Sequence, residues 1–529
     1  MTSARTTIDQ LVRQAAADRG DHEALIDAPN RADFFHGEPL RLTWTEVDHA
    51  VTNLATQLAG MGVGVDTRVG IQLPNAAELA LTILVCARLR AVAVPFPIQH
   101  RTHEIRHGTE TAGITHFVTA ARADRPDHVD LLREIAAEVG GIQIALFGDA
   151  GGLPQLSVDA RGAPALPDES GPDDVVSVCW TSGTTGTPKG VPRTNAMWLA
   201  TGYTQADQLG LSPADRMLCP FPVVNMAGIG GMLLPWVITG STLVMHQPLD
   251  LPVFLGQIEG EAITYTVSPP PLLNMLIRNE ALLASTDWSS VRAICSGSAP
   301  LDAWMIEGWE ARGIEIINAF GSNEGSALLS NRSGVPDPSS RARFFPRPDP
   351  AVLDVRLIDL DTGDEITDAG RMGELRYRGS TVFEGYLDSD GDEFDSDGWF
   401  RSGDLFEWVE QHEGAPLMRF VDRAKDIIIR GGMNVSAAEV EALIAAHPAV
   451  AECAVVAYPD RDLGERVGVF VVAAPDASPS LDDVVAQMRE ADVASYKIPE
   501  RLEVVEALPR NPVGKVVKPD LRARWADAG

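Results

Sequence analysis

The sequence is poor in cysteine, and its cysteines are not spaced as a disulfide framework or a zinc site requires. Its 529 residues include five cysteines, an odd number, with no C-x-x-C pair. Scattered thiols are typical of a reducing compartment, so we expect a cytoplasmic protein. The first 19 residues alternate charge with alanine, and no signal peptide is expected. The cysteines are Cys86, Cys179, Cys219, Cys295 and Cys453.

Positive charge is also scarce. Lysine and arginine number 43 against 74 aspartates and glutamates, which gives a net charge of −31 and an isoelectric point near 4.7. A protein that binds nucleic acid needs a basic surface, so no nucleic acid partner is expected. An anionic ligand would have to be held by a local group of donors. A chain of 529 residues with 45% hydrophobic residues is expected to form two or more domains.

No apolar run has the character of a membrane span. Met217–Leu249 contains no Asp, Glu, Lys or Arg, but four prolines and four glycines interrupt it. We therefore expect a loop and a short buried helix near Ile229–Leu234 that ends at Pro235. A buried strand is expected to follow at Ser241–Met245.

Strand and helix patterns alternate along the first part of the chain. Val69–Leu73 and Val92–Phe96 have the composition of strands, and Glu78–Arg88 between them is typical of a buried helix. This alternation predicts an α/β fold. The last hundred residues or so contain short strands and helices that fit a small α+β domain.

The most informative motif is Trp180–Val191, which follows the β-branched run Val175–Cys179. It is rich in glycine and hydroxyl groups and contains one lysine, Lys189. The backbone N–H groups of such a loop can turn inward around an oligophosphate, and Lys189 adds a positive charge. It is not a Walker A loop, where the lysine directly follows a glycine. The alternative is a flexible turn that binds no ligand, which is disfavoured because the pattern extends over twelve residues.

This loop resembles the phosphate loop of the adenylate-forming superfamily, which includes acyl- and aryl-CoA synthetases, adenylation domains of peptide synthetases and luciferases. The resemblance covers nearly the whole chain, because further motifs follow in the family's order. These motifs are Phe221–Gly228, Ala293–Leu301, Phe320–Gly325, Asp397–Leu405, Arg419–Asp426 and Leu508–Val516.

The resemblance implies a large α/β N-terminal domain of several subdomains at residues 1–421. A hinge at 422–425 would join it to a small α+β C-terminal lid at 426–529, and the lid would alternate between two positions. Lys425 would be the pivot of the hinge, and Gly431 and Gly432 would line a tunnel for pantetheine.

The resemblance also implies a role for each site residue. Glu324 would hold Mg²⁺, and Asn323 and Lys515 would act with it in catalysis. Asp404 and Arg423 would bind the ribose of ATP or AMP. The rest of the nucleotide would be bound by Thr181, Ser182, Gly183, Thr184, Thr185, Gly186, Lys189, Ser298, Ala299, Pro300, Phe320 and Gly321. The acid pocket would include Asn225, Met226, Gly228, Ser298 and Ser322.

Three residues depart from the family's pattern. Arg90 stands where the family usually has glycine at a helix-to-strand turn, and Asn225 replaces a histidine near the acid. Asn323 replaces a threonine that donates to the α-phosphate, although its amide can also donate. For Asn225, a purely structural role in its loop carries equal weight.

Three functions compete at this stage. The first is an acyl-CoA ligase that joins a small carboxylic acid to ATP, releases pyrophosphate with Mg²⁺ and passes the acyl group to coenzyme A. The second is an aryl-acid AMP ligase that loads the phosphopantetheine of a carrier protein. The dihydroxybenzoate ligases are the most similar in several segments, but they usually have His-Asn where this chain has Asn225-Met226. The third, a non-catalytic adenylate-binding protein, is disfavoured by Lys515, Glu324 and Asp404.

The residues around the predicted acid pocket are small or apolar. They include no lysine or arginine for a second carboxylate and no aspartate for an amino group. Because an unpaired buried ammonium is costly, we expect a monocarboxylic acid with an uncharged tail, either aromatic or bulky and apolar. The sequence leaves a homodimer open.

Overall fold

The computed structural model describes residues 6–123, 128–149, 151–159, 166–181, 188–297, 301–409, 416–431, 433–490, 493–511 and 515–526. By its internal contacts the chain forms two compact units. One consists of residues 1–354 and 378–398, and the other of residues 355–377 and 399–529. This division describes which residues contact one another, whereas the hinge expected at 422–425 is a prediction about which part of the chain rotates. The domain boundaries at 1–421 and 426–529 therefore stay a prediction.

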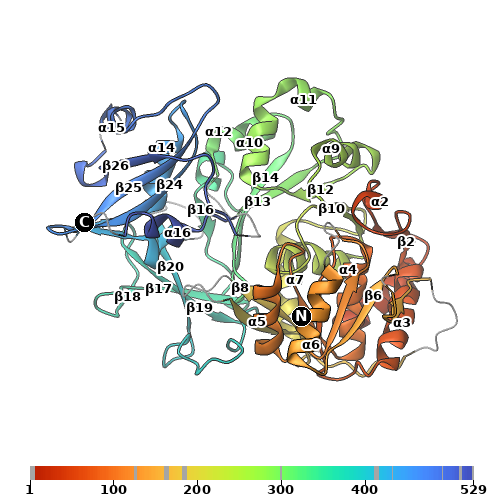
Figure 1. Ribbon diagram of the computed structural model, residues 1–529. Coiled ribbons are helices and arrows are strands. Elements are labelled where there is room, and N and C mark those ends of the chain that lie inside the picture. Colours follow the sequence, from red (N-terminus) through yellow and green to blue (C-terminus); the bar gives the residue numbers. More distant parts are fainter. Residues whose placement is uncertain are drawn as a thin grey trace. The chain divides into compact units, whose positions relative to one another are not determined.

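One sheet of the first unit is mostly parallel (Figure 1). Its inner strands pair parallel, and an antiparallel strand closes each edge. Across the sheet the strands are β15 (Ala327–Ser330), β14 (Glu315–Gly321), β13 (Ala293–Gly297), β12 (Tyr265–Val267), β10 (Arg216–Cys219), β11 (Thr242–Met245), β1 (Glu23–Ile26) and β2 (Arg41–Thr43).

The other sheet of the first unit is parallel except for its last strand, β9, which pairs antiparallel with β8. This pair forms the hairpin that carries the predicted phosphate loop. Across the sheet the strands are β7 (Gln155–Leu156), β6 (Gln143–Phe147), β5 (His116–Ala120), β3 (Arg68–Ile71), β4 (Val92–Pro95), β8 (Val175–Thr181) and β9 (Lys189–Thr194).

Helices cover both sheets of the first unit in layers. One apolar core joins a face of each sheet to α1 (Ile8–Arg19), α3 (Trp44–Gly60), α4 (Ala77–Leu89), α7 (Asn195–Gln208) and α8 (Leu234–Thr239). The opposite face of the first sheet packs on α9 (Leu251–Gly260), α10 (Pro270–Arg278), α11 (Glu280–Ala284) and α12 (Ala303–Glu310). The opposite face of the second packs on α5 (Thr102–Ala112) and α6 (His128–Val139).

The second unit contains two groups of strands. One follows the order β21 (Leu417–Arg423), β20 (Phe400–Val409), β19 (Met372–Gly379), β17 (Leu353–Ile358) and β18 (Glu365–Ile366). The other follows the order β23 (Met433–Val435), β22 (Ile428–Arg430), β25 (Gly464–Ala473) and β24 (Val450–Asp460), with β26 (Arg501–Val504) also paired to β25. One face of this sheet packs on α14 (Ala437–Ala445) and α15 (Leu481–Glu490), and the other on α16 (Lys518–Ala523).

Most elements expected from the sequence are present, and the α/β fold with a smaller α+β part is confirmed. Glu78–Arg88 lies within α4, nearly all of which is buried, as its continuous apolar character indicates. The expectation about Pro235 was wrong. Pro235 does not end a helix but lies in the first turn of α8, which continues to Thr239. Pro270 and Pro271 likewise begin α10. Proline is tolerated in a first turn because no helical partner is needed for its nitrogen.

Among the described residues, no helix is both long enough and apolar enough to cross a membrane.

Candidate active site

Three of the predicted motifs leave the same edge of the same sheet. β10, β13 and β14 all belong to its parallel part, and Gly297 at the end of β13 pairs with Ala319 of β14. The carboxyl ends of these strands therefore lie together, which is where open α/β sheets bind ligands. Phe320 and Gly321 end β14, so they lie beside the strand that leads into the predicted adenine segment. The residues of that segment, Ser298, Ala299 and Pro300, lie outside the described part of the chain.

The predicted phosphate loop is the connection of a β-hairpin. Thr181 and Lys189 are cross-strand partners in the β8–β9 pair, so they flank the mouth of the loop. The loop residues Ser182, Gly183, Thr184, Thr185 and Gly186 lie outside the described residues, and their role stays a prediction. Lys189 is partly exposed, and its ammonium lies 4.6 Å from the ring centroid of Tyr386.

Asn323 connects the base of the phosphate loop with the loop expected at the acid. Its Nδ2 donates to the carbonyl of Trp180, the residue before Thr181, at 3.0 Å. Its Oδ1 accepts from the backbone amide of Met226 at 2.8 Å. Both ends of this side chain are therefore bound to protein. A threonine in the same position has one hydroxyl and is too short to make both contacts in the same way.

The side chain of Arg193 holds the backbone of Asn323 by a hydrogen bond. This side chain is fully buried, and its guanidinium donates to the carbonyls of Asn323 at 2.9 Å and Thr381 at 2.7 Å. It also donates to the hydroxyl of Thr201 at 2.9 Å and stacks on Trp198 at 4.4 Å. Because β9 carries both Lys189 and Arg193, the phosphate-loop hairpin is tied to the segment that contains Glu324.

Glu324 is nearly buried, with 8% of its surface exposed. One carboxylate oxygen, Oε1, accepts from the hydroxyl of Tyr386 at 2.8 Å, and its carbonyl accepts from the amide of Phe383 at 2.9 Å. Within the described part of the chain, no hydrogen bond reaches Oε2. A carboxylate with one oxygen left for a ligand suits a hard cation such as Mg²⁺. No group of three His, Cys, Asp or Glu side chains among the described residues is placed to hold a metal ion.

The loop expected at the acid opens a π-helix, Met226–Leu233 (η2). Asn225 caps this helix, because its Oδ1 accepts from the amides of Ala227 at 3.1 Å and Gly228 at 3.2 Å. A Cβ on Gly228 would lie 2.2 Å from the carbonyl oxygen of Pro222, so only glycine fits there. The structural alternative for Asn225 thus has direct support, and direct contact of its Oδ1 with the acid does not.

Ser322, the remaining residue expected at the acid, lies at the turn after β14. Its amide donates to the carbonyl of Ser326 at 3.0 Å, and the two hydroxyls lie 3.2 Å apart. Ser322 directly precedes Asn323 in the chain. Its role at the acid stays a prediction.

In the second unit the two residues expected at the ribose lie together. Arg423 and Asp404 are register partners in the β20–β21 pair, and Nε of Arg423 lies 3.3 Å from Oδ1 of Asp404. The amide of Asp404 donates to the hydroxyl of Ser402 at 3.0 Å. A carboxylate can accept from both hydroxyls of a ribose.

The expected hinge joins β21 to β22 through the short helix η3 (Ala424–Asp426). On one side, the buried Asp422 accepts from the hydroxyl of Ser436 and the amide of Ala438, both at 3.0 Å, and so holds the start of α14. On the other side, Arg522 of α16 donates to the carbonyl of Lys425 at 3.3 Å and pairs with Asp426. The role of Lys425 as pivot stays a prediction.

Gly431 and Lys515, expected at the pantetheine and in catalysis, lie in the second unit. Gly431 has φ +58° in the turn between β22 and β23, a conformation that favours glycine; Gly432 lies outside the described residues. Lys515 is exposed, and its backbone forms two hydrogen bonds with Asn511. The Lys515 amide donates to Oδ1 of Asn511, and the Lys515 carbonyl accepts from the Asn511 amide, each at 2.9 Å.

Sequence reasoning missed two residues of the site. Arg193 belongs to no predicted motif, although a lone arginine in a buried hairpin strand is an unusual composition that could have indicated a role for it. Nothing in the local sequence of Tyr386 indicates that it contacts Glu324, 62 residues away.

Comparisons with known proteins identify the family of the chain. Residues 12–387 match the AMP-binding enzyme family, and residues 439–515 match the AMP-binding enzyme C-terminal domain. The chain is 31% identical over 494 residues to the medium-chain fatty-acid–CoA ligase of Escherichia coli, covering 90% of this chain and 84% of that protein. It is 32% identical over 533 residues to a methyl-dioxo-octahydro-indenyl propanoyl:CoA ligase of Mycobacterium tuberculosis, covering 97% of each.

The structure is similar to that of ATP-bound MatB from Rhodopseudomonas palustris. The TM-score is 0.83 at 25% sequence identity, and the match covers 99% of this chain and 100% of that one. With a family match that extends over residues 12–387, more than half of its length, this chain belongs to the AMP-binding enzymes of the adenylate-forming superfamily.

Proposed function

We propose that this protein is an AMP-forming acyl-CoA ligase. It joins a carboxylic acid to ATP to give an acyl-adenylate and pyrophosphate, and then transfers the acyl group to the thiol of coenzyme A. One observation supports this proposal above the others: Asn323 is bonded both to the base of the phosphate loop and to the loop expected at the acid. The two reactants of the first step would thus meet beside Glu324.

The first step needs positioning and charge stabilisation more than a protein nucleophile. A carboxylate is a poor electrophile, and joining it to AMP gives a mixed anhydride with a good leaving group. Lys189 and Thr181 at the mouth of the loop would hold the departing pyrophosphate. Mg²⁺, held by Glu324 together with the phosphates, would neutralise part of their charge.

The second unit would complete the site. Asp404 and Arg423 would bind the ribose, and Lys515 would lie between the acid carboxylate and the nucleotide in the first step. Turning about Lys425 would then remove Lys515 and bring the turn at Gly431 and Gly432 to the pantetheine. The ion pair of Asp404 and Arg423 and the exposure of Lys515 support these roles.

The acid is proposed to be a monocarboxylic acid with an uncharged tail, aromatic or bulky and apolar. Val223 and Val224, which precede Asn225, are buried, and no charged side chain stands in the segment from Phe221 to Leu234. The two relatives named above act on a medium-chain fatty acid and on a bicyclic propanoic acid, both of which have uncharged tails.

Three finer points concern the acceptor thiol, the compartment and the oligomeric state. Transfer to a carrier-protein phosphopantetheine is the alternative to coenzyme A, because the same residues would serve either thiol. The described cysteines are all free thiols, four of them buried, which supports a cytoplasmic protein. A homodimer would be tested by the molar mass in solution.

A pyrophosphate-release screen over a panel of carboxylic acids tests the function. We expect release that depends on both ATP and the acid, and consumption of the free thiol when coenzyme A is added. Release without thioester formation on coenzyme A, but with it on a phosphopantetheinyl carrier protein, would support the alternative. No acid-dependent release from a folded enzyme across aromatic, aliphatic and polycyclic acids would reject both.

A further inference from the structure

Tyr386 contacts two of the residues that the proposed function assigns to magnesium and ATP. Its hydroxyl donates to Oε1 of Glu324 at 2.8 Å, and its ring lies 4.6 Å from the ammonium of Lys189. Lys189 and Glu324 are separated by 135 positions in the sequence, and this one side chain lies against both. Tyr386 belongs to the connection between β19 and β20, which packs with the first unit.

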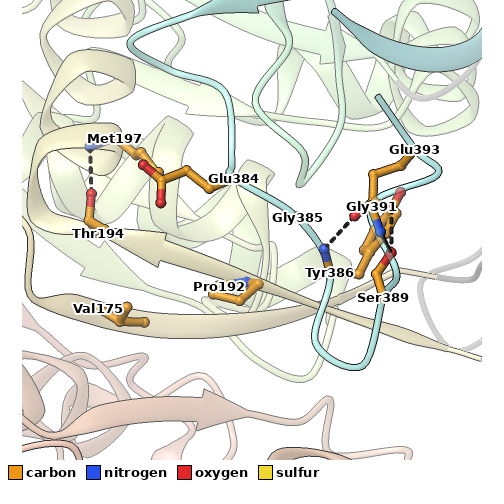
Figure 2. Close-up of a pocket in the computed structure, with 10 residues that line it drawn as sticks. All are labelled: Val175, Pro192, Thr194, Met197, Glu384, Gly385, Tyr386, Ser389, Gly391 and Glu393. Atoms are coloured by element: carbon orange, nitrogen blue, oxygen red, sulfur yellow. Dashed lines mark hydrogen bonds between the residues drawn. The ribbon is translucent and has the colours of Figure 1, made fainter. Parts of the chain in front are cut away.

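The backbone on either side of Tyr386 is fixed. The amide of Leu387 donates to the carbonyl of Gly190, the residue after Lys189, at 2.9 Å. The amide of Tyr386 itself donates to Oε1 of Glu393 at 2.9 Å, and the hydroxyl of Ser389 donates to the same carboxylate (Figure 2). The tyrosine is therefore held against the exit of the phosphate loop independently of its contact with Glu324.

The hydroxyl of Tyr386 sets the orientation of the Glu324 carboxylate. Glu324 is 8% exposed, and the Tyr386 hydroxyl is the hydrogen-bond partner of its carboxylate among the described residues. Since this bond engages Oε1, it leaves Oε2 for a cation. Without this bond the carboxylate could rotate, and metal binding would then have to overcome the entropic cost of fixing it.

The ring of Tyr386 acts on Lys189. A lysine side chain is flexible, and fixing it on a ligand costs rotamer entropy. A cation over an aromatic face is attracted to the ring, so the ring restricts the ammonium to the mouth of the loop before any phosphate is bound.

We propose that Tyr386 is a positioning residue for magnesium–ATP binding: its hydroxyl orients Glu324 for the metal, and its ring holds Lys189 for the phosphates. This inference rests on the proposed function, because it takes Glu324 as the metal carboxylate and Lys189 as the phosphate lysine. It adds a distinct role for each half of the tyrosine side chain, which two substitutions can separate.

The experiment compares Tyr386→Phe, which removes only the hydroxyl, with Tyr386→Leu, which removes the ring as well. Tyr203→Phe is the matched control, since Tyr203 lies half-buried on α7, away from both residues. Calorimetry gives the affinity for ATP without metal, and the electron paramagnetic resonance signal of free Mn²⁺ gives metal affinity with ATP present. Melting temperatures check that each variant is folded.

Tyr386→Phe should weaken Mn²⁺ binding about tenfold or more, the value of one hydrogen bond to a charged acceptor, and leave metal-free ATP binding unchanged. Tyr386→Leu should also weaken metal-free ATP binding, by about two- to fivefold. Tyr203→Phe should change neither affinity.

The inference and the proposed function can fail separately. If Glu324→Gln weakens Mn²⁺ binding but Tyr386→Phe does not, the hydroxyl has no positioning role, although Glu324 keeps its own. If Tyr386→Leu and Tyr386→Phe have equal metal-free ATP affinities, the ring has no effect on Lys189. If Glu324→Gln and Lys189→Ala bind Mn²⁺ and ATP like the unaltered protein, the proposed function itself is wrong.

Discussion

Asn323 accepts a hydrogen bond from the backbone amide of Met226 at 2.8 Å. Its own amide group donates to Trp180 at 3.0 Å, so one side chain spans the acid loop and the base of the phosphate loop. The family resemblance implies a threonine at this position, whose hydroxyl would donate to the α-phosphate. The asparagine of this chain thus acts in part on the protein itself, and it should couple the binding of the two substrates.

Asn323→Asp and Asn323→Thr should separate these contacts. The aspartate keeps the acceptor for Met226 but loses the donor to Trp180 and adds a negative charge near the phosphates. We expect a rise in the KM of ATP of about fivefold or more, from one lost hydrogen bond plus repulsion. The threonine restores a phosphate donor but shortens the bridge, so it should raise the KM of the acid by about fivefold and spare that of ATP.

Both KM values are measured by pyrophosphate exchange with each substrate varied in turn. Asn331→Asp is a matched control: Asn331 also uses its side chain in backbone hydrogen bonds, but outside the site. Equal effects of the two Asn323 variants on both substrates would mean that the side chain stabilises the fold locally and does not couple the substrates.

Lys515→Ala should nearly abolish formation of the acyl-adenylate. The positive charge of Lys515 would offset the repulsion between the acid carboxylate and the nucleotide. Its removal should therefore lower the rate of the first half-reaction by a factor on the order of 10²–10³ or more. Thioester formation from a pre-made acyl-adenylate should be spared, because Lys515 is displaced in that step. Lys497→Ala is the control, since this lysine of the same unit pairs with Glu439. A similar loss in both half-reactions would contradict the division of labour.

Lys425→Pro should have the opposite effect. Proline fixes φ and restricts the preceding residue, so the segment at η3 should remain in one conformation. If that conformation serves adenylation, pyrophosphate exchange should persist while thioester formation falls. Arg522→Ala provides a comparison, because it removes the guanidinium on the Lys425 carbonyl without restricting the backbone. Should both half-reactions fall together in Lys425→Pro, Lys425 is not the pivot.

Arg90 has a structural explanation that the sequence did not provide. It ends α4 in the left-handed conformation with φ +56°, which accounts for the glycine common at this position. Its guanidinium forms two hydrogen bonds with Asp174, at 2.9 and 3.0 Å. Arg90→Gly should relieve about 1 kcal/mol of backbone strain and lose a partly exposed ion pair of small net value, so the stability should change little. Arg90→Ala loses the pair, keeps the strain and should be the less stable variant.

The pH dependence of this pair has a defined sign. Burial alone would raise the pKa of Asp174, but the hydrogen bonds from Arg90 and the Gly171 amide lower it overall. A lowered pKa in the folded state stabilises the protein above the ordinary pKa of aspartate, and this contribution is lost as the pH falls through the folded value. The difference in stability between the unaltered protein and Arg90→Ala should therefore shrink on acidification, as urea denaturation at neutral and acidic pH would reveal.

The sequence predicted the elements of this fold where composition alone decides, as in α4, which is buried on nearly every side. It failed at Pro235, because the pattern does not distinguish a proline that ends one helix from a proline that begins the next. The site residues with motifs could be predicted by their place in the chain. Arg193 and Tyr386 could not, because their roles depend on contacts with Asn323 and Glu324, which only the folded chain brings near.

The identity of the acid is the last prediction. Because Oδ1 of Asn225 caps the π-helix, it is less able to accept a hydrogen bond from the ortho-hydroxyl of an aromatic acid than its sequence position indicates. Val223 and Val224 beside it are buried, and the helix that follows is apolar. We therefore expect uncharged aromatic, medium-chain or polycyclic monocarboxylic acids to exceed amino acids in kcat/KM, because an ammonium would lose its water without gaining a partner.

Competition in pyrophosphate exchange makes the comparison directly. Benzoate, salicylate, octanoate and a bicyclic propanoic acid compete against a set of amino acids of similar size. Since one unpaired buried charge costs several kcal/mol, the preference should be on the order of 10²-fold or more. Salicylate should show no advantage over benzoate if the Asn225 oxygen is committed to the helix. A preference for an amino acid would show that the pocket contains an anionic group elsewhere, and the assignment of the acid loop would then be wrong even though adenylation would stand.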